Sequence, residues 1–262
     1  MPYKHLRRTE EGQVTTVILA RPYAHNALTA DLIDELTRCF EELAEDQETK
    51  VVVLAGEGRS FCAGADIGYL RETAELSYEE NLEDARRLAM MFWTIDECPK
   101  PVVAKVQGAA MGGGAGLLAV ADVVVADSEA RFAFSEIRLG IAPATISPFV
   151  VRKIGVSHAR SLFVTGERFG AERAREIGLV HRVVASDGLD EAVEDKLSDL
   201  LEGGPVAQAT IKGLLRRLET TEPMEAPGLT ARVISELRTG EEGQEGLAAF
   251  LEKREPGWRR ER

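Results

Sequence analysis

Residues Val106–Gly116 read VQGAAMGGGAG. The apolar run Val102–Val106 at the start of this segment predicts a buried strand, and the glycines predict a turn that opens a short helix ending near Ala121. Small residues in such a turn let a ligand approach the backbone closely, and the first turn of a helix leaves N–H groups without partners inside the helix. The segment therefore predicts a place where main-chain donors face a bound ligand.

A second segment of small residues has the same setting. Gly56–Ile67 reads GEGRSFCAGADI and follows Val51–Leu54, another predicted buried strand. Two such segments can aim two N–H donors at one oxygen, an arrangement called an oxyanion hole, and loss of one donor typically lowers the rate by ~10²–10³. A third segment, Ala133–Gly140 (AFSEIRLG), contributes the carboxylate of Glu136. Taken alone, such a carboxylate is most often solvated or salt-bridged.

Predicted strands and helices alternate on either side of these segments. Further strands are predicted near residues 3–8, 14–20 and 123–126. One helix is predicted from Thr29, with Leu32, Ile33, Leu36, Cys39, Phe40 and Leu43 at helical spacing, and another after Ser77, with Leu82, Ala85, Ala89, Phe92 and Trp93 on one face. This order of elements predicts an α/β fold with a mostly parallel sheet.

The character of the chain changes after about Ile141, where helical patterns dominate. We therefore predict two parts, an α/β core at residues 1–190 that holds the ligand site and a helical region at residues 191–262. The apolar faces of the C-terminal helices favour oligomerisation, since such faces need a partner to cover them.

The composition argues against several classes of function. The 262 residues include 32 basic and 44 acidic residues, and the net charge of −12 disfavours nucleic acid as a partner, although a small anionic ligand remains compatible with it. The N-terminus lacks the apolar middle of a signal peptide, and the chain has no run of 18 apolar residues that would predict a membrane span. Three cysteines without CxxC spacing favour a reducing, cytoplasmic setting, and the scattered histidines predict no metal site.

Five motifs in order along the chain resemble the enoyl-CoA hydratase/isomerase family, also called crotonases. They are Arg21–Leu28 (RPYAHNAL), Phe61–Ile67 (FCAGADI), Gly108–Gly114 (GAAMGGG), Phe134–Glu136 (FSE) and Ala249–Trp258 (AFLEKREPGW). The resemblance implies a crotonase-like spiral of ββα turns, followed by a helical C-terminal region that builds homotrimers, often paired into hexamers. It also implies an acyl-CoA substrate and a lyase of fatty acid metabolism, with coenzyme A as part of the substrate and no metal or redox cofactor.

The resemblance also implies roles for individual residues. The backbone N–H groups of Ala65 and Gly113 would form the oxyanion hole for the thioester carbonyl, and Glu136 would be the catalytic carboxylate. The residues that would bind the substrate or its CoA group are Ala24, Ala63, Gly64, Ala65, Asp66, Ile67, Gly68, Gly113 and Lys253. Asp66 is equally well interpreted as a helix cap, and Lys253 as part of a solvated basic tail.

One departure from the family pattern bears on the chemistry. Hydratases of this family usually carry two catalytic glutamates, and Glu136 aligns with the later one. The earlier one lies 20 residues before it, and that position here is Gly116. The stretch Leu139–Pro148 (LGIAPATISP) is similar to bacterial methylglutaconyl-CoA hydratases of leucine and isoprenoid breakdown, whose substrates carry a distal carboxylate. That carboxylate, or a differently placed side chain, would then handle the water or proton.

Gly116 therefore leaves three interpretations open. The first is hydration or dehydration of an enoyl-CoA, for which methylglutaconyl-CoA is a candidate. The second is a shift of the double bond between positions 3 and 2, which one carboxylate can catalyse. The third is a CoA-binding protein that has lost catalysis. A dinucleotide-dependent dehydrogenase is disfavoured because residues 112–117 lack the final glycine of the GxGxxG fingerprint.

Overall fold

The computed structural model describes residues 2–259, and six strands within this range form the main sheet, in the order β1-β2-β3-β4-β6-β9. The strands are β1 (Leu6–Glu11), β2 (Val14–Leu19), β3 (Val51–Gly56), β4 (Val102–Val106), β6 (Val123–Asp127) and β9 (Arg182–Val184). Only the hairpin of β1 and β2 is antiparallel, and each later pairing is parallel. The prediction of a mostly parallel sheet is confirmed.

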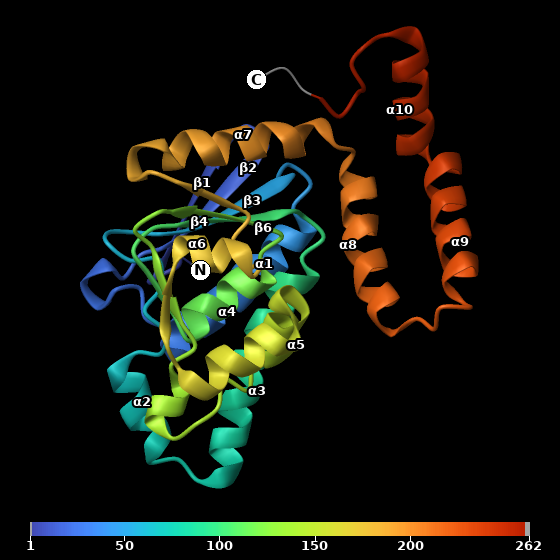
Figure 1. Cartoon of the computed structure of the whole chain (residues 1–262). Coiled ribbons are helices and arrows are strands. Elements are labelled where there is room, and N and C mark those ends of the chain that lie inside the picture. The colour runs from blue at the N-terminus through green and yellow to red at the C-terminus, as the bar shows by residue number, and fades with distance from the viewer. Residues whose placement is uncertain (1, 260–262) are drawn as a thin grey trace.

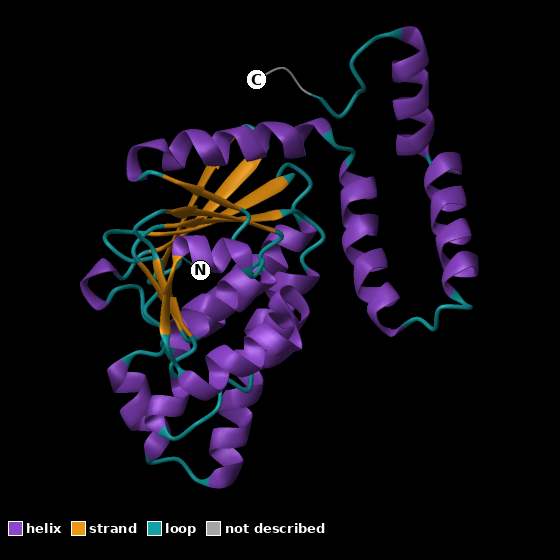
Figure 2. Cartoon of the chain, viewed as in Figure 1, coloured by secondary structure: helices purple, strands orange, loops and turns teal. Residues whose placement is uncertain are grey.

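A second, smaller sheet lies beside the main one (Figure 2). It contains β5 (Ala109–Met111), β7 (Arg131–Ala133) and β8 (Arg168–Gly170). None of these three strands was predicted, because three residues are too few for an alternating pattern to be recognised. This small sheet matters for the site because β5 leads directly into the glycines at 112–114, and β7 leads into Glu136.

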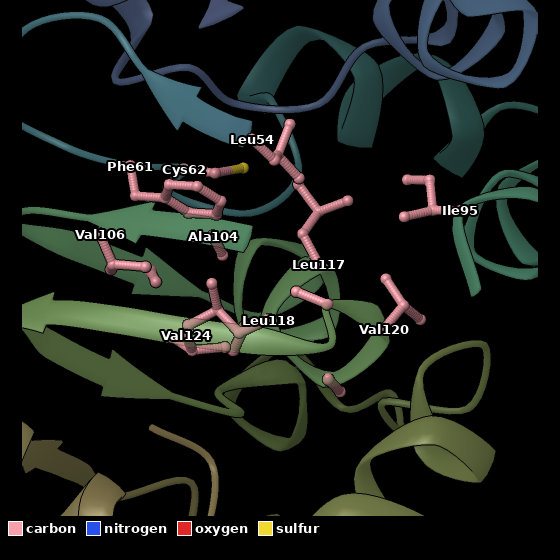
Figure 3. Packing of buried hydrophobic residues seen from close by; sticks show 14 of the residues in the cluster. Leu54, Phe61, Cys62, Ile95, Ala104, Val106, Leu117, Leu118, Val120 and Val124 are labelled. Carbon is pink, nitrogen blue, oxygen red and sulfur yellow. The ribbon is translucent and has the colours of Figure 1, made fainter. Parts of the chain in front are cut away.

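Helices cover both faces of the main sheet (Figure 1). One face carries α1 (Ala30–Glu45), α3 (Tyr78–Glu97), α4 (Gly113–Val120) and α5 (Ser147–Thr165), and the other carries α7 (Leu189–Glu202). Thr29 begins α1 as predicted, since its side chain accepts a hydrogen bond from the Leu32 N–H at 3.3 Å. Figure 3 shows Leu117 and Leu118 of α4 among sheet residues such as Leu54 and Val124, all of them buried.

The predicted apolar face of α3 is only partly correct. Phe92 is buried, but Leu82 and Trp93 are 38% and 53% exposed, and the buried set is instead Met91, Phe92, Ile95 and Asp96. Leu82 is exposed because the N-terminal half of α3 extends beyond the core together with α2 (Ile67–Ala74), a helix of which only the cap at Asp66 was anticipated (Figure 1). Trp93 lies in the C-terminal half of α3, where Met91, Phe92 and Ile95 form the buried face instead. The short helix α6 (Ala171–Glu176) follows β8.

The last three helices form an arm that projects from the core (Figure 1). They are α8 (Pro205–Thr220), α9 (Ala226–Thr239) and α10 (Glu241–Glu252). The arm is fixed to the core through α8, where Lys212 Nζ lies 2.6 Å from Asp122 Oδ2. The boundary at residues 190/191 stays a prediction. Within residues 2–259, no helix is both long and apolar enough to cross a membrane.

Candidate active site

The two segments of small residues run side by side in parallel. The Cys62 N–H donates to Ala109 O at 3.0 Å, and the Met111 N–H donates to Cys62 O at 2.9 Å. Two residues further on, the backbones still touch, because a Cβ on Gly64 would lie 2.9 Å from Met111 O. Ala65 and Gly113, the predicted oxyanion residues, therefore follow at the same end of this paired stretch.

The direction of the Ala65 N–H follows from the bonds of its neighbours. The Leu28 N–H donates to Gly64 O at 2.7 Å, and the Asp66 N–H donates to Leu28 O at 2.8 Å. In a ladder of this kind, the residue between two bonded neighbours points its own N–H and C=O to the opposite side. The Ala65 N–H is thus directed away from Leu28, and Ala65 is exposed.

Gly113 is the first residue of α4, so its N–H has no acceptor inside the helix and lies at the positive end of the helix dipole. The preceding residue, Gly112, has φ 51° and ψ −120°, a conformation that requires glycine. A hydrogen bond of 2.8 Å from the Gly112 N–H to Ala133 O fixes this turn to β7. A side chain at 113 would crowd Leu28, because a Cβ there would lie 2.7 Å from Leu28 Cδ1.

Glu136 lies directly against this turn. It begins a short 3₁₀ helix (Glu136–Leu139) after β7, and its Oε1 would lie 3.0 Å from a Cβ on Gly112. Its Oε2 is buried, with no hydrogen-bond partner among residues 2–259. Burial raises the pKa of the Glu136 carboxyl above its usual value, because the charged form loses water without gaining a cation. The group is therefore suited to hold a proton and release it to a neighbour.

Gly116, the position at which the family resemblance implies a glutamate in hydratases, is enclosed by apolar side chains. A Cβ at this position would lie 2.3 Å from Ile146 Cγ2 and 3.0 Å from Phe92 Cε1. Both of these residues are buried, so packed hydrocarbon occupies the space into which a residue-116 side chain would extend. The unusual stretch Leu139–Pro148, which includes Ile146, was the feature of the sequence that pointed to this packing. Nothing in the sequence indicated the contact with Phe92.

The predicted CoA-binding residues at 63–68 form the rim beside Ala65. Ala63, Ile67 and Gly68 are exposed, whereas Gly64 is buried. Ala24 is half-buried, and the neighbouring His25 O accepts a hydrogen bond of 3.0 Å from the Ala63 N–H, which places Ala24 close to the same rim.

Asp66 has two structural partners, and only its role as a helix cap was anticipated from the sequence. It caps α2, with its Oδ1 accepting the Gly68 N–H at 2.8 Å, and its Oδ2 lies 3.0 Å from Nη2 of Arg21. Arg21 was missed because the two residues are 45 positions apart and no local pattern links them.

Lys253 is not brought to the other predicted site residues within one chain. It follows the end of α10, whose main packing partners are α9 and α8. Figure 1 places α10 at the far end of the arm, away from α2 and α4. A contact between Lys253 and CoA stays a prediction.

Comparisons with known proteins identify the family to which the chain belongs. Residues 9–261 match the family model described as enoyl-CoA hydratase/isomerase. The putative enoyl-CoA hydratase of Thermus thermophilus is 33% identical over 249 residues, which cover 95% of this chain and 98% of that protein. The 2,3-dehydroadipyl-CoA hydratase of Escherichia coli is 33% identical over 252 residues, covering 96% and 97%.

Solved structures are equally similar. An enoyl-CoA hydratase from Shewanella pealeana has a TM-score of 0.95 at 37% identity, covering 98% of this chain and 96% of that one. Pseudomonas aeruginosa AtuE has a TM-score of 0.94 at 36% identity, covering 97% and 99%. The chain therefore has the crotonase fold and is an enzyme of the enoyl-CoA hydratase/isomerase family.

Proposed function

We propose that this enzyme adds water to, or removes it from, the double bond of a 2-enoyl-CoA thioester. The thioester oxygen is held by the N–H groups of Ala65 and Gly113. One observation carries the proposal. The outward-directed N–H of Ala65 and the first N–H of α4 lie at the same end of the two paired segments, and Glu136 lies against the same turn. The names of the Thermus and Escherichia relatives, both hydratases, support the reaction type.

The proposed chemistry has two stages. As the oxygen of water bonds to C3, the π electrons of the C2–C3 double bond move onto the thioester carbonyl, and the water gives up one proton. The enolate oxygen so formed accepts hydrogen bonds from Ala65 and Gly113, donors that are already in place before the charge develops. The enolate then collapses as C2 takes a proton from Glu136. One molecule of water has been added across the double bond.

Glu136 supplies only one of the two proton transfers that hydration needs. Its raised pKa suits the donation to C2, since the carboxyl is protonated to a larger extent than an ordinary glutamate. Apolar side chains pack against Gly116, so the proton of the attacking water must be accepted by a group outside this turn of α4.

We propose that the distal carboxylate of the substrate accepts the proton of the attacking water. In methylglutaconyl-CoA this carboxylate is one methylene from C3, within reach of a water molecule that attacks there. The name of the Escherichia relative, 2,3-dehydroadipyl-CoA hydratase, refers to another acyl group derived from a dicarboxylic acid. The proton returns to Glu136 through solvent before the next turnover.

Isomerisation is the second candidate, and the contact between Gly116 and Ile146 favours it. A single carboxylate can take a proton from C2 of a 3-enoyl-CoA, which forms a dienolate on the thioester, and return it to C4, with no water activated. Glu136 with its buried Oε2 meets that requirement alone.

A panel of three thioesters separates the candidates. Hydration of crotonyl-CoA or methylglutaconyl-CoA lowers the absorbance of the conjugated thioester and adds the mass of one water, whereas isomerisation of a 3-enoyl-CoA raises the absorbance at constant mass. We expect methylglutaconyl-CoA to be hydrated faster than crotonyl-CoA. Turnover of the 3-enoyl-CoA alone would establish isomerisation instead, and tight CoA binding without any turnover would indicate a member that has lost catalysis.

We also propose that the enzyme works in the cytoplasm as a homotrimer or hexamer, assembled through the arm. Ile211 and Leu215 of α8 and Phe250 and Leu251 of α10 are between 51% and 81% exposed, an apolar surface that a second copy would cover. The mass in solution, measured by light scattering, tests the assembly, and Leu215→Glu should lower that mass. The chemistry needs no metal or redox cofactor, and full activity after dialysis against a chelator is the expected result.

A further inference from the structure

We infer that the ion pair of Arg21 and Asp66 fixes the direction of the Ala65 N–H, which makes both of them positioning residues for the proposed reaction. The inference rests on the proposed function, because it gives these two residues a role in aligning one donor of the oxyanion hole. Neither side chain needs to touch the reacting atoms, since the effect passes through the backbone on either side of Ala65.

The Arg21 guanidinium joins the two backbone segments that meet at Ala65. Its Nη1 donates to Ala27 O, and its Nη2 donates to Asp66 Oδ2 at 3.0 Å. Ala27 immediately precedes Leu28, and Asp66 immediately follows Ala65, so one planar group connects both sides of the pairing between Leu28 and Ala65. The fork geometry of a guanidinium suits this double contact.

The pair is shielded from water, so the contact is strong enough to hold a backbone in place. The Arg21 side chain is 9% exposed and that of Asp66 20% exposed. Although partial burial alone would raise it, the bonds from the Gly68 N–H and Arg21 keep the pKa of Asp66 below its usual value. The carboxylate therefore stays charged and paired at the pH at which the enzyme works.

Arg21 is itself held by the segment that leads to Ala65. The Arg21 N–H donates to Asn26 Oδ1 at 2.9 Å. The Nδ2 of this buried Asn26 donates to Glu57 O at 2.9 Å and to Ser60 O at 2.8 Å. These hydrogen bonds fix the backbone of Arg21, so its guanidinium is held in place beside Asp66.

Asp66→Asn is the sharpest variant for a test. The asparagine oxygen can still accept the Gly68 N–H and cap α2, but its NH₂ group would face the donor of Arg21. Arg21→Lys keeps the charge and loses the fork, so it can reach Ala27 O or Asp66, but not both at once.

A matched control lies at the other end of the sheet. Asp46 accepts the Glu48 N–H on Oδ1 at 2.9 Å and pairs with Arg8 through Oδ2 at 2.8 Å, and its side chain is 21% exposed. Asp46→Asn therefore makes the same chemical change at a carboxylate with the same two kinds of partner, although Asp46 Oδ2 also accepts the Thr49 hydroxyl at 2.7 Å. Asp46 comes before β3, whereas Ala65 comes after it, so the control is remote from the site.

Two readouts separate positioning from mere stability. The first is kcat and KM for an enoyl-CoA substrate. The second is the absorption maximum of bound cinnamoyl-CoA with a para-dimethylamino group, a chromophore whose maximum moves to longer wavelength as its thioester carbonyl is polarised. All variants are assayed as folded full-length enzyme well below their melting temperatures.

We expect Asp66→Asn to lower kcat by ~10- to 100-fold, since a misplacement of about 1 Å can cost a rate factor of ~100. The red shift of the chromophore should shrink, while the dissociation constant of free CoA stays within ~3-fold. Arg21→Lys should give an intermediate loss, and Asp46→Asn should leave kcat and the red shift as in the wild type.

Two outcomes would overturn the inference. One is an Asp66→Asn enzyme with an unchanged kcat and an unchanged red shift. Another is a variant that weakens CoA binding at constant kcat, which would make Asp66 a ligand contact. A wild type that turns over no enoyl-CoA and shifts no chromophore would instead refute the oxyanion hole itself, so the two failures are distinguishable.

Discussion

The Cγ2 methyl of Ile146 lies 2.3 Å from the Cβ that Gly116 lacks. This contact decides what a return to the two-glutamate pattern of related hydratases would require. Gly116→Glu alone forces a carboxylate into packed hydrocarbon, and we expect it to destabilise the fold by more than ~3 kcal/mol, the sum of overpacking and of burying an unpaired charge.

The double variant Gly116→Glu with Ile146→Gly removes the obstructing side chain. We expect it to recover part of the lost stability and to hydrate crotonyl-CoA faster than the wild type, because two carboxylates then face the substrate. Urea unfolding and the absorbance assay measure the two effects. A double variant no more stable than the single one would show that Ile146 is not the obstacle.

Glu136→Gln should lower turnover by ~10²–10⁴-fold, the usual contribution of a general acid or base. Glutamine keeps the size and the hydrogen-bonding oxygen of the side chain, so the affinity for free CoA should be nearly unchanged. Steady-state kinetics and calorimetry with CoA check both statements. Undiminished turnover in the variant would remove Glu136 as the proton carrier.

The same variant should change how stability depends on pH. Since the pKa of Glu136 is raised in the folded state, the folded enzyme binds this proton more tightly than the unfolded chain does. Its contribution is therefore fully present at pH below the ordinary pKa of a glutamate and is lost as the pH rises through the raised value. Glu136→Gln should raise the melting temperature at neutral pH relative to the wild type, and the advantage should disappear in acid.

Gly112→Ala should reduce activity through the position of Glu136. Both Gly112 and Gly12 have positive φ, of 51° and 57°, so alanine is strained at either site, at a cost of ~1–3 kcal/mol. Only at residue 112 does the new methyl meet the Glu136 carboxylate, whereas nothing lies within 4 Å of a Cβ on Gly12. We therefore expect kcat to fall in Gly112→Ala and to be unchanged in Gly12→Ala. Equal activities would argue against the placement of Glu136.

Much of this architecture could be predicted from local patterns. The periodicity of Leu32 to Leu43 and the apolar runs at β3 and β4 are strong, because long elements repeat their signal several times. The three-residue strands of the small sheet give no such repetition, although β5 and β7 place Gly112 and Glu136 side by side. Nor did the sequence show that α3 would extend beyond the core near Leu82, or that Trp93 would be exposed beside the buried Phe92.

The site shows the same division between local and long-range information. The glycine turn and Glu136 were recognised because they lie in short motifs. The pairing of Arg21 with Asp66 joins residues 45 positions apart, and the packing of Phe92 and Ile146 at Gly116 joins three separate elements. Contacts of this kind depend on the tertiary fold, and a single sequence carries no direct record of them.

The outward direction of the Ala65 amide has a consequence for mutational surveys. The hydrogen belongs to the peptide link, so exchanging one side chain for another at position 65 leaves it in the molecule. An alanine scan is blind there, since the residue is already alanine. Proline would delete the atom but would also constrain the backbone, whereas an amide-to-ester replacement, introduced by chemical ligation, deletes it and keeps the side chain.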